Sequence, residues 1–97
     1  MTEGLWVDRG RGVAGYGVHL LRLSPQEVAV LATLADAAGR VVSRSELVRR
    51  SGLRHASPRR ADSLLVTVRR ALGGGALRTV RGRGWMLDPE AVVVASD

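Results

Sequence analysis

The stretch "RTVRGRGWML", residues 78–87, has the strongest influence on how the rest of this sequence is interpreted. Arginine and glycine alternate at its centre, and a tryptophan follows at once. A run of this kind is compatible with a phosphate-binding glycine loop, a flexible RNA-binding repeat or the turn of a β-hairpin. Apolar residues alternate with polar ones before the glycines and follow them closely afterwards, which favours a hairpin over residues 77–87.

The composition predicts one soluble domain with a polyanionic partner. The chain has 97 residues and a hydrophobic fraction of 45%, enough for a single modest core, and without Phe that core must be largely aliphatic. The formal net charge is +6, which favours binding to a polyanion. All 15 basic side chains are Arg, whose planar fork suits phosphate and guanine. The absence of Lys, Ile, Asn and Phe is equally explained by GC-rich coding.

The sequence argues against catalytic, metal and cofactor sites. The sequence has no Cys, and His19 and His55 are isolated, with no paired carboxylates at useful spacing. We therefore expect no enzyme, no metal and no cofactor. "GRGVAG", Gly10 to Gly15, matches a dinucleotide fingerprint, but it leads into a strand rather than a helix. There is no membrane-spanning run and no signal peptide, so we expect a cytoplasmic protein without a membrane partner.

The N-terminal part is expected to form a short antiparallel region. Residues 5–8 and 16–23 are the predicted strands, and the glycine-rich residues 9–15 separate them. Alternation places Tyr16, Val18 and Leu20 on one face of the second strand.

Three helices are predicted over about 25–38, 44–51 and 58–72. Ser24, Ser43 and Ser57 are the candidate N-caps, and the first two are each followed three residues later by a Glu that completes a capping box. Proline occupies the first position of the first and third helices, where its missing N–H has no cost. Gly39 and Gly52 are the expected stops of the first two helices.

The third helix has two distinct faces. Its apolar face is formed by Ala61, Leu65, Val68 and Leu72. Its opposite face collects Arg59, Ser63, Val66, Thr67 and Arg70, with Arg60 and Arg69 beside them. Such a face carries what a helix needs in a major groove: arginines for guanine or phosphate, and methyl groups for thymine. A merely solvated face is the alternative, and the adjacent "VRGRG" with the net charge favours nucleic acid.

The order strand, three helices and hairpin is that of an α+β winged helix-turn-helix. From about Leu20 to Leu87 the sequence resembles the DNA-binding effector domain of OmpR/PhoB-type response regulators, most specifically in "GRVVSRSEL" and "TVRGRGW". The segments "ADSLLVTVRRALG" and "LRTVRGRGWML" continue the resemblance. It implies a four-stranded N-terminal antiparallel sheet, three helices and a C-terminal hairpin called the wing. We expect residues 1–88 to form one domain and residues 89–97 a tail or an edge strand.

The resemblance implies a bacterial transcription regulator that binds double-stranded DNA sequence-specifically, with the third helix in the major groove. The major-groove residues would be Arg59, Asp62, Ser63, Val66, Thr67 and Arg70. Arg81 of the wing would enter the minor groove. The phosphate contacts would be Ser43, Arg44, Arg60, Arg69, Arg78 and Arg83. In addition, Trp85 is expected to anchor the returning strand in the core.

The sequence also departs from that family. Thr67 stands where the family usually has Arg, and the loop 51–58 is short and lacks the usual aromatic and acidic residues. In relatives this loop touches RNA polymerase, and its changed composition argues against activation by that route here. Relatives also bind direct repeats head to tail, so RNA polymerase, a larger regulator and a second copy on direct-repeat DNA stay open as partners. The 97 residues do not include a receiver domain, so a stand-alone regulator and part of a larger regulator both stay open.

Two other functions remain open from the sequence. One is a winged-helix protein-interaction module in which the charge is incidental. The other is an RNA-binding protein with an RGG-like segment, since "RGRG" also occurs at residues 9–12.

Overall fold

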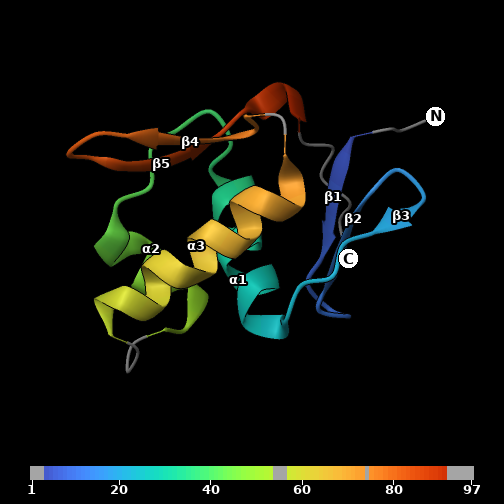
Figure 1. The fold of residues 1–97 in the computed structure, drawn as a ribbon, viewed down its shortest axis with the longest axis horizontal. Coiled ribbons are helices and arrows are strands. Elements are labelled where there is room, and N and C mark those ends of the chain that lie inside the picture. The colour runs from blue at the N-terminus through green and yellow to red at the C-terminus, as the bar shows by residue number, and fades with distance from the viewer. Residues whose placement is uncertain (1–3, 54–56, 74, 92–97) are drawn as a thin grey trace.

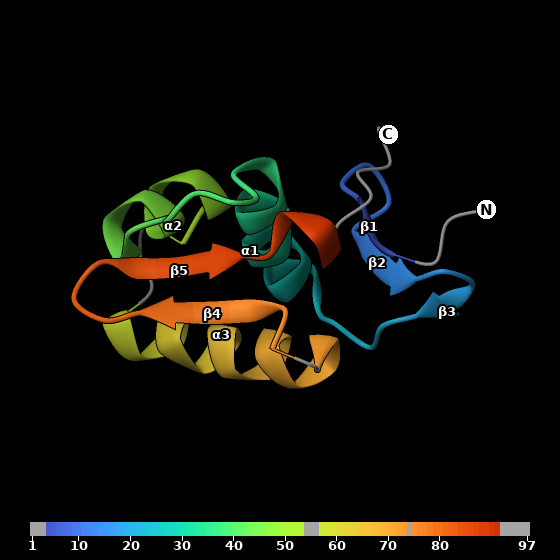
Figure 2. The ribbon, with the colours of Figure 1, turned by 90° about the horizontal axis from the view of Figure 1, so that it is seen from above.

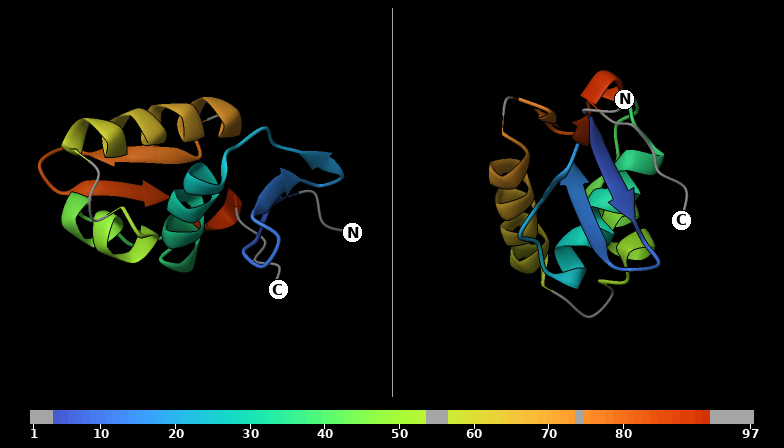
Figure 3. Two further views of the ribbon diagram at one scale, coloured as in Figure 1. Left: turned by 90° about the horizontal axis from the view of Figure 1, so that it is seen from below. Right: turned by 90° about the vertical axis from the view of Figure 1, so that its right-hand side faces the viewer.

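The computed structural model describes residues 4–53, 57–73 and 75–91. The elements are β1 (Leu5–Asp8), β2 (Val13–Tyr16), β3 (His19–Leu20), α1 (Pro25–Asp36), α2 (Arg44–Ser51), α3 (Pro58–Leu72), β4 (Leu77–Val80), β5 (Gly84–Leu87) and a final 3-10 turn at Pro89–Ala91. The helices form the centre, with the sheet β1–β2–β3 to one side of them and the β4–β5 hairpin along another (Figure 1; Figure 3). This is the predicted α+β architecture.

The three helices begin at the predicted serines. Ser24 Oγ accepts a hydrogen bond from the Glu27 amide, and the Glu27 carboxylate accepts one from the Ser24 amide, which completes the capping box of α1. Ser43 and Ser57 cap α2 and α3 through their hydroxyls. Each of these bonds joins residues only three positions apart, so it depends on the local sequence and not on contacts with distant parts of the chain.

The first helix ends two residues before its predicted end at residue 38. Its final turn tightens, because the amides of Ala37 and Ala38 bond to the carbonyls three residues earlier. Gly39, at φ +85°, then turns its amide towards the Leu87 carbonyl of β5 at 2.9 Å. The bond to β5 therefore draws the chain out of the helix.

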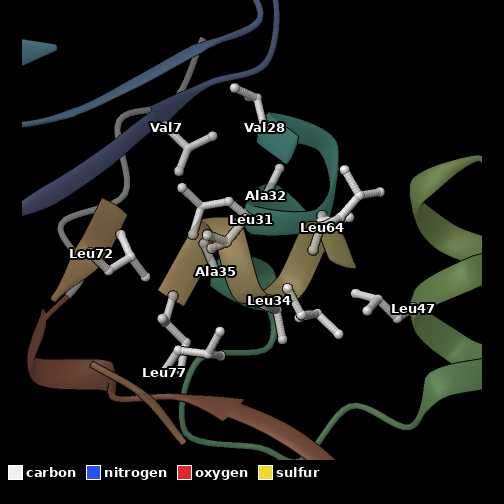
Figure 4. Packing of buried hydrophobic residues seen from close by; sticks show 14 of the residues in the cluster. Val7, Val28, Leu31, Ala32, Leu34, Ala35, Leu47, Leu64, Leu72 and Leu77 are labelled. Carbon is white, nitrogen blue, oxygen red and sulfur yellow. The ribbon is translucent and has the colours of Figure 1, made fainter. Parts of the chain in front are cut away.

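The core surrounds α1 on several sides. Besides the predicted Val28, Leu31, Ala32 and Ala35, the helix buries Val30, Thr33 and Leu34. This happens because α1 contacts both other helices and also β1, β2 and β5, so a single apolar stripe underestimates its burial. Figure 4 shows Leu31, Leu34 and Ala35 of α1 among labelled side chains of the other elements, namely Val7 of β1, Leu47 of α2, Leu64 and Leu72 of α3, and Leu77 of β4.

The N-terminal strands differ from the prediction. The predicted strand 16–23 is wrong, because the chain turns at Gly17 and Val18 after β2 and returns as the two-residue β3. Gly17 has φ +55°, its amide bonds to the Gly4 carbonyl, and its own carbonyl accepts from Trp6 Nε1 at 2.7 Å. The predicted shared face of Tyr16, Val18 and Leu20 is therefore wrong as well, since Val18 lies in the turn and is 91% exposed. The described residues form three strands in this sheet, not the four that the resemblance implied.

The hairpin lies at the predicted residues and gains a third partner. Leu77 pairs with Leu87 and Val80 with Gly84 across β4 and β5. Val42, in the link between α1 and α2, bridges to Trp85 through two backbone bonds of 2.7 and 2.9 Å. The hairpin is thus attached along β5 to the segment that leads into α2.

The expected C-terminal tail begins as the 3-10 turn, in which the Glu90 amide bonds to Asp88 Oδ1 at 2.9 Å. Residues 92–97, like His55 and its neighbours, lie outside the described residues. Among the helices that the structure describes, none combines the length and the hydropathy needed to cross a membrane.

Candidate nucleic-acid interface

The outward face of α3 carries a stripe of arginine, serine and valine, which we call the α3 stripe: Arg59, Ser63, Val66 and Arg70. All four side chains are exposed, and the stripe runs roughly 16 Å along the helix at 1.5 Å per residue. Thr67 lies beside it, half-buried, and its hydroxyl donates to the Ser63 carbonyl at 3.3 Å. The predicted apolar face is buried in full and is joined by Leu64.

One flank of the stripe is tied to the start of α2. The Arg44 guanidinium donates to both carboxylate oxygens of Asp62, with the shortest distance 2.9 Å from Nη2 to Oδ1. The same guanidinium lies over the ring of Trp85 in β5, 5.5 Å from its centroid. Arg44 therefore joins α2, α3 and the hairpin, and Asp62 pairs with an arginine instead of standing free.

The same flank is tied to β4 further along the helix. Arg69 Nη2 donates a hydrogen bond to the Thr79 hydroxyl. Together with the Arg44–Asp62 pair, this bond holds the hairpin beside α3, and Figure 2 shows β4 running alongside the helix. These side-chain contacts add to the buried packing of Leu77 and Leu87 and to the Val42–Trp85 backbone bonds, which attach the hairpin to the helices.

The opposite flank faces the start of α1. Arg60 Nη2 donates to Gln26 Oε1 at 2.7 Å. Arg60, which was predicted to contact phosphate, thus lies on the opposite side of the stripe from Arg69. The stripe is bordered by these two arginines, and each donates a hydrogen bond to an uncharged side chain, Gln26 or Thr79.

The tip of the hairpin presents arginines at a tight turn. The Arg83 amide bonds to the Val80 carbonyl at 2.9 Å, and Gly82 has φ +75°, the backbone that the third position of a type II turn requires. Arg81 and Arg83 are exposed there, and Arg78 is exposed on β4. Within the described part of the chain, none of these three side chains makes a hydrogen bond or an ion pair.

A hollow of about 450 Å³ lies between the start of α2 and the hairpin, lined by Ser43, Arg44, Ser45, Thr79, Val80, Gly82, Arg83, Gly84 and Trp85. Ser43 Oγ accepts from the Glu46 amide at 3.1 Å, whereas the amides of Arg44 and Ser45 precede the first intrahelical bond and have no helical acceptor. The hollow therefore combines two guanidinium groups with free helix amides, which suits an anion.

Comparisons with known proteins identify the family of this chain. The family model for the transcriptional regulatory protein C-terminal domain matches residues 18–87. The chain belongs to this family. A search of the curated proteins finds no match.

Solved structures of this OmpR/PhoB-type family have the same fold. The DNA-binding domain of the response regulator AdeR, solved with an intercistronic region, is 25% identical with a TM-score of 0.78, over 91% of this chain and 97% of that one. The DNA-binding domain of CpxR from E. coli is 27% identical, TM-score 0.77, over 95% and 96%. The DNA-binding domain of Klebsiella pneumoniae RstA, solved with the RstA box, is 24% identical, TM-score 0.75, over 92% and 95%, and it supports the fold alone. The family consists of DNA-binding regulator domains and is not an enzyme family.

In this OmpR/PhoB-type domain the structure gathers most of the predicted residues around α3 and the hairpin. Sequence reasoning missed Gln26 and Thr79, the partners of Arg60 and Arg69, because neither carries a motif and each is distant along the chain. Trp85, predicted as a core anchor, is half-buried against the core and also supports Arg44.

The capping box predicted at Ser43 is only half formed. The Glu46 carboxylate accepts from Arg40 and Arg50, each at 3.1 Å, instead of from the Ser43 amide. The hydrogen bond from Arg40, and then that from Arg50, holds the pKa of Glu46 below its ordinary value. Arg40 and Arg50 are thereby engaged on the side of α2 that faces α1, where Arg50 also approaches Asp36 at 3.8 Å.

Proposed function

We propose that this domain binds a specific double-stranded DNA site with α3 in the major groove and the hairpin as the wing in the adjacent minor groove. The observation that carries the proposal is the α3 stripe together with the arginines of the hairpin. The stripe is exposed along one helix, and the wing is held beside the same helix through Arg69 and Thr79. A major groove about 12 Å wide accepts one such helix.

The proposed base-reading residues are those of the stripe, together with Thr67. Arg59 and Arg70 carry guanidinium groups without a partner among the described residues, so both are available to guanine edges or phosphates. Asp62 was expected in the groove as well. Its pairing with Arg44 favours a different role, in which the carboxylate orients Arg44 at the edge of the groove.

The proposed phosphate contacts lie around the stripe. In the hollow at the start of α2, Arg44, Arg83 and the free helix amides would hold one phosphate, with Ser43 fixing the helix start. Arg69 and Arg78 would contact the backbone on the wing side, and Arg60 on the α1 side. Phosphate contacts on both flanks would set the register of α3 in the groove.

Arg81 is the proposed minor-groove residue. It occupies the second position of the exposed turn, which makes it the side chain at the tip of the wing. Narrow A·T-rich minor grooves attract an inserted arginine through their enhanced negative potential.

The test is a titration of fluorescent duplexes at several salt concentrations. We expect binding to mixed duplexes with a Kd of about 10⁻⁴ to 10⁻⁶ M near physiological salt, falling steeply as salt rises, and tighter binding to duplexes selected from a random pool. Arg59→Ala and Arg70→Ala should weaken binding to the selected duplex. Arg11→Ala is the matched control, because Arg11 is an exposed arginine at the β1–β2 turn. Absence of binding at low salt, or equal losses for Arg11 and Arg59, would refute the proposal.

The same titration gives the stoichiometry on a direct-repeat duplex, which tests head-to-tail binding of two copies. Contact with RNA polymerase stays a prediction from the resemblance.

A further inference from the structure

We propose that α3 selects its site chiefly by the 5-methyl groups of thymine, through Val66 and the Thr67 methyl, instead of by an arginine–guanine pair at the centre of the helix. The inference rests on the proposed function and specifies the chemistry of the DNA that it would bind.

The first observation is the exposure of Val66. Among the described residues, the large apolar side chains left exposed are Val18, Leu20 and Val66, and only Val66 belongs to a helix. It is 47% exposed, and it lies in the middle of the α3 stripe, between Ser63 and Arg70. An exposed branched side chain in the middle of an otherwise polar stripe gains stabilisation only when another apolar group covers it.

The second observation concerns Thr67. Its hydroxyl is already bonded to the Ser63 carbonyl one turn earlier, so a base would need to displace this bond to use the hydroxyl as a donor. Thr67 is half-buried, and its methyl group is the part of the side chain that makes no hydrogen bond. Val66 and Thr67 together therefore offer methyl groups at the centre of the helix, and thymine is the base that presents a methyl group in the major groove.

The third observation is that two polar side chains on the wing flank of this centre are occupied. Asp62, which could accept from cytosine, is held by Arg44 through both of its oxygens. Arg69 is held by Thr79 on the wing. The arginines of the stripe itself stand near its ends, roughly 10 Å from Val66 in the case of Arg59 and roughly 6 Å in the case of Arg70. On the stripe itself, Ser63 and Arg70 are the polar residues next to Val66, so the methyl groups share the centre with one small hydroxyl, and the nearer arginine stands one turn away at the end of the stripe.

The experiment replaces thymine with deoxyuridine in the duplex selected from a random pool, one position at a time. This substitution removes the 5-methyl group and keeps every hydrogen-bonding atom of the base. We expect at least one position to lose about fourfold in affinity, which is the effect of withdrawing one methyl-sized group from an apolar contact. Fluorescence anisotropy at constant salt measures the change.

Protein variants identify the side chains that read the methyl group. Val66→Ala should bind the thymine and the deoxyuridine duplex equally at one sensitive position, because the contact is already absent, and Thr67→Ser should do the same at an adjacent position while keeping its hydroxyl bond to Ser63. Val18→Ala, which shortens an exposed valine at the β2–β3 turn, should retain the full thymine preference. Both residues of α3 are at least partly exposed, so we expect each variant to fold, and thermal unfolding checks this.

The outcomes separate the inference from the function. If the wild-type chain binds its selected duplex specifically and deoxyuridine changes nothing at any position, the inference is refuted and the proposed function stands. If the loss persists unchanged in both Val66→Ala and Thr67→Ser, other residues read the methyl groups and the inference is also refuted. If no sequence is selected and no duplex binds, the proposed function fails and the inference fails with it.

Discussion

Among the glycines whose surroundings the structure describes, Gly84 is the one at which an added Cβ atom would come closest to a neighbouring atom. A Cβ atom placed on Gly84 would lie 2.0 Å from the carbonyl oxygen of Val42, 2.7 Å from its carbonyl carbon and 2.9 Å from Cα of Ser43. All three are backbone atoms, so no side chain can move aside to make room. The backbone of Gly84 also has φ +146°, which residues with a Cβ rarely adopt.

The cost of Gly84→Ala follows from what must separate. The clash forces β5 away from the link before α2, and the two backbone bonds between Val42 and Trp85, of 2.7 and 2.9 Å, are lost. Two such bonds contribute about 2 kcal/mol, and the strained φ adds about 1–3 kcal/mol. We therefore expect a loss of about 3–5 kcal/mol in the free energy of unfolding, a large part of the 5–15 kcal/mol typical of a domain.

Gly82→Ala is the matched control. Gly82 also has a positive φ, of +75°, but a Cβ there meets nothing within 4 Å. Its cost is limited to the backbone, about 1–2 kcal/mol. Urea unfolding followed by circular dichroism gives both values. Equal losses for the two variants would refute the reasoning, because the collision with Val42 would then contribute nothing.

Three further predictions concern the interface and its support. Arg81→Ala should weaken binding to the selected duplex by about 1–3 kcal/mol and relax the preference for A·T pairs at one step, with an unchanged Tm; unaltered selection from a random pool would exclude Arg81 from the minor groove. Arg44→Ala should lower the slope of log K against log salt by about one, as expected for one phosphate contact, and an unchanged slope would place Arg44 outside the phosphate site. Arg40 and Arg50 lower the pKa of Glu46 in the folded state. The ionised carboxylate therefore stabilises the fold at pH values above the ordinary Glu pKa of about 4.3, and this stabilisation is lost as the pH falls through the lower pKa of the folded state. Glu46→Gln should therefore be less stable than the parent at neutral pH and approach it in acid, and a difference independent of pH in urea unfolding would contradict this.

The expectations that held depend on short-range chemistry. Ser24, Ser43 and Ser57 cap their helices through bonds that span three residues, and the buried face of α3 follows from periodicity within one helix. The expectations that failed depend on partners far along the chain. The chain turns at Gly17, after β2, because the Gly17 amide and carbonyl bond to Gly4 and Trp6. After α1, the Gly39 amide bonds to the Leu87 carbonyl of β5.

The sequence by itself determined the family, the helix starts, the composition of the α3 stripe and the position of the hairpin, because each is a local pattern of residue types. Only the tertiary structure decided how the many arginines are used. It pairs Arg44 with Asp62 over Trp85, Arg69 with Thr79 and Arg60 with Gln26, and it leaves Val66 exposed among them. The physical reason is that a guanidinium group bonds to whatever acceptor lies within about 3 Å, and packing of the whole chain selects that acceptor.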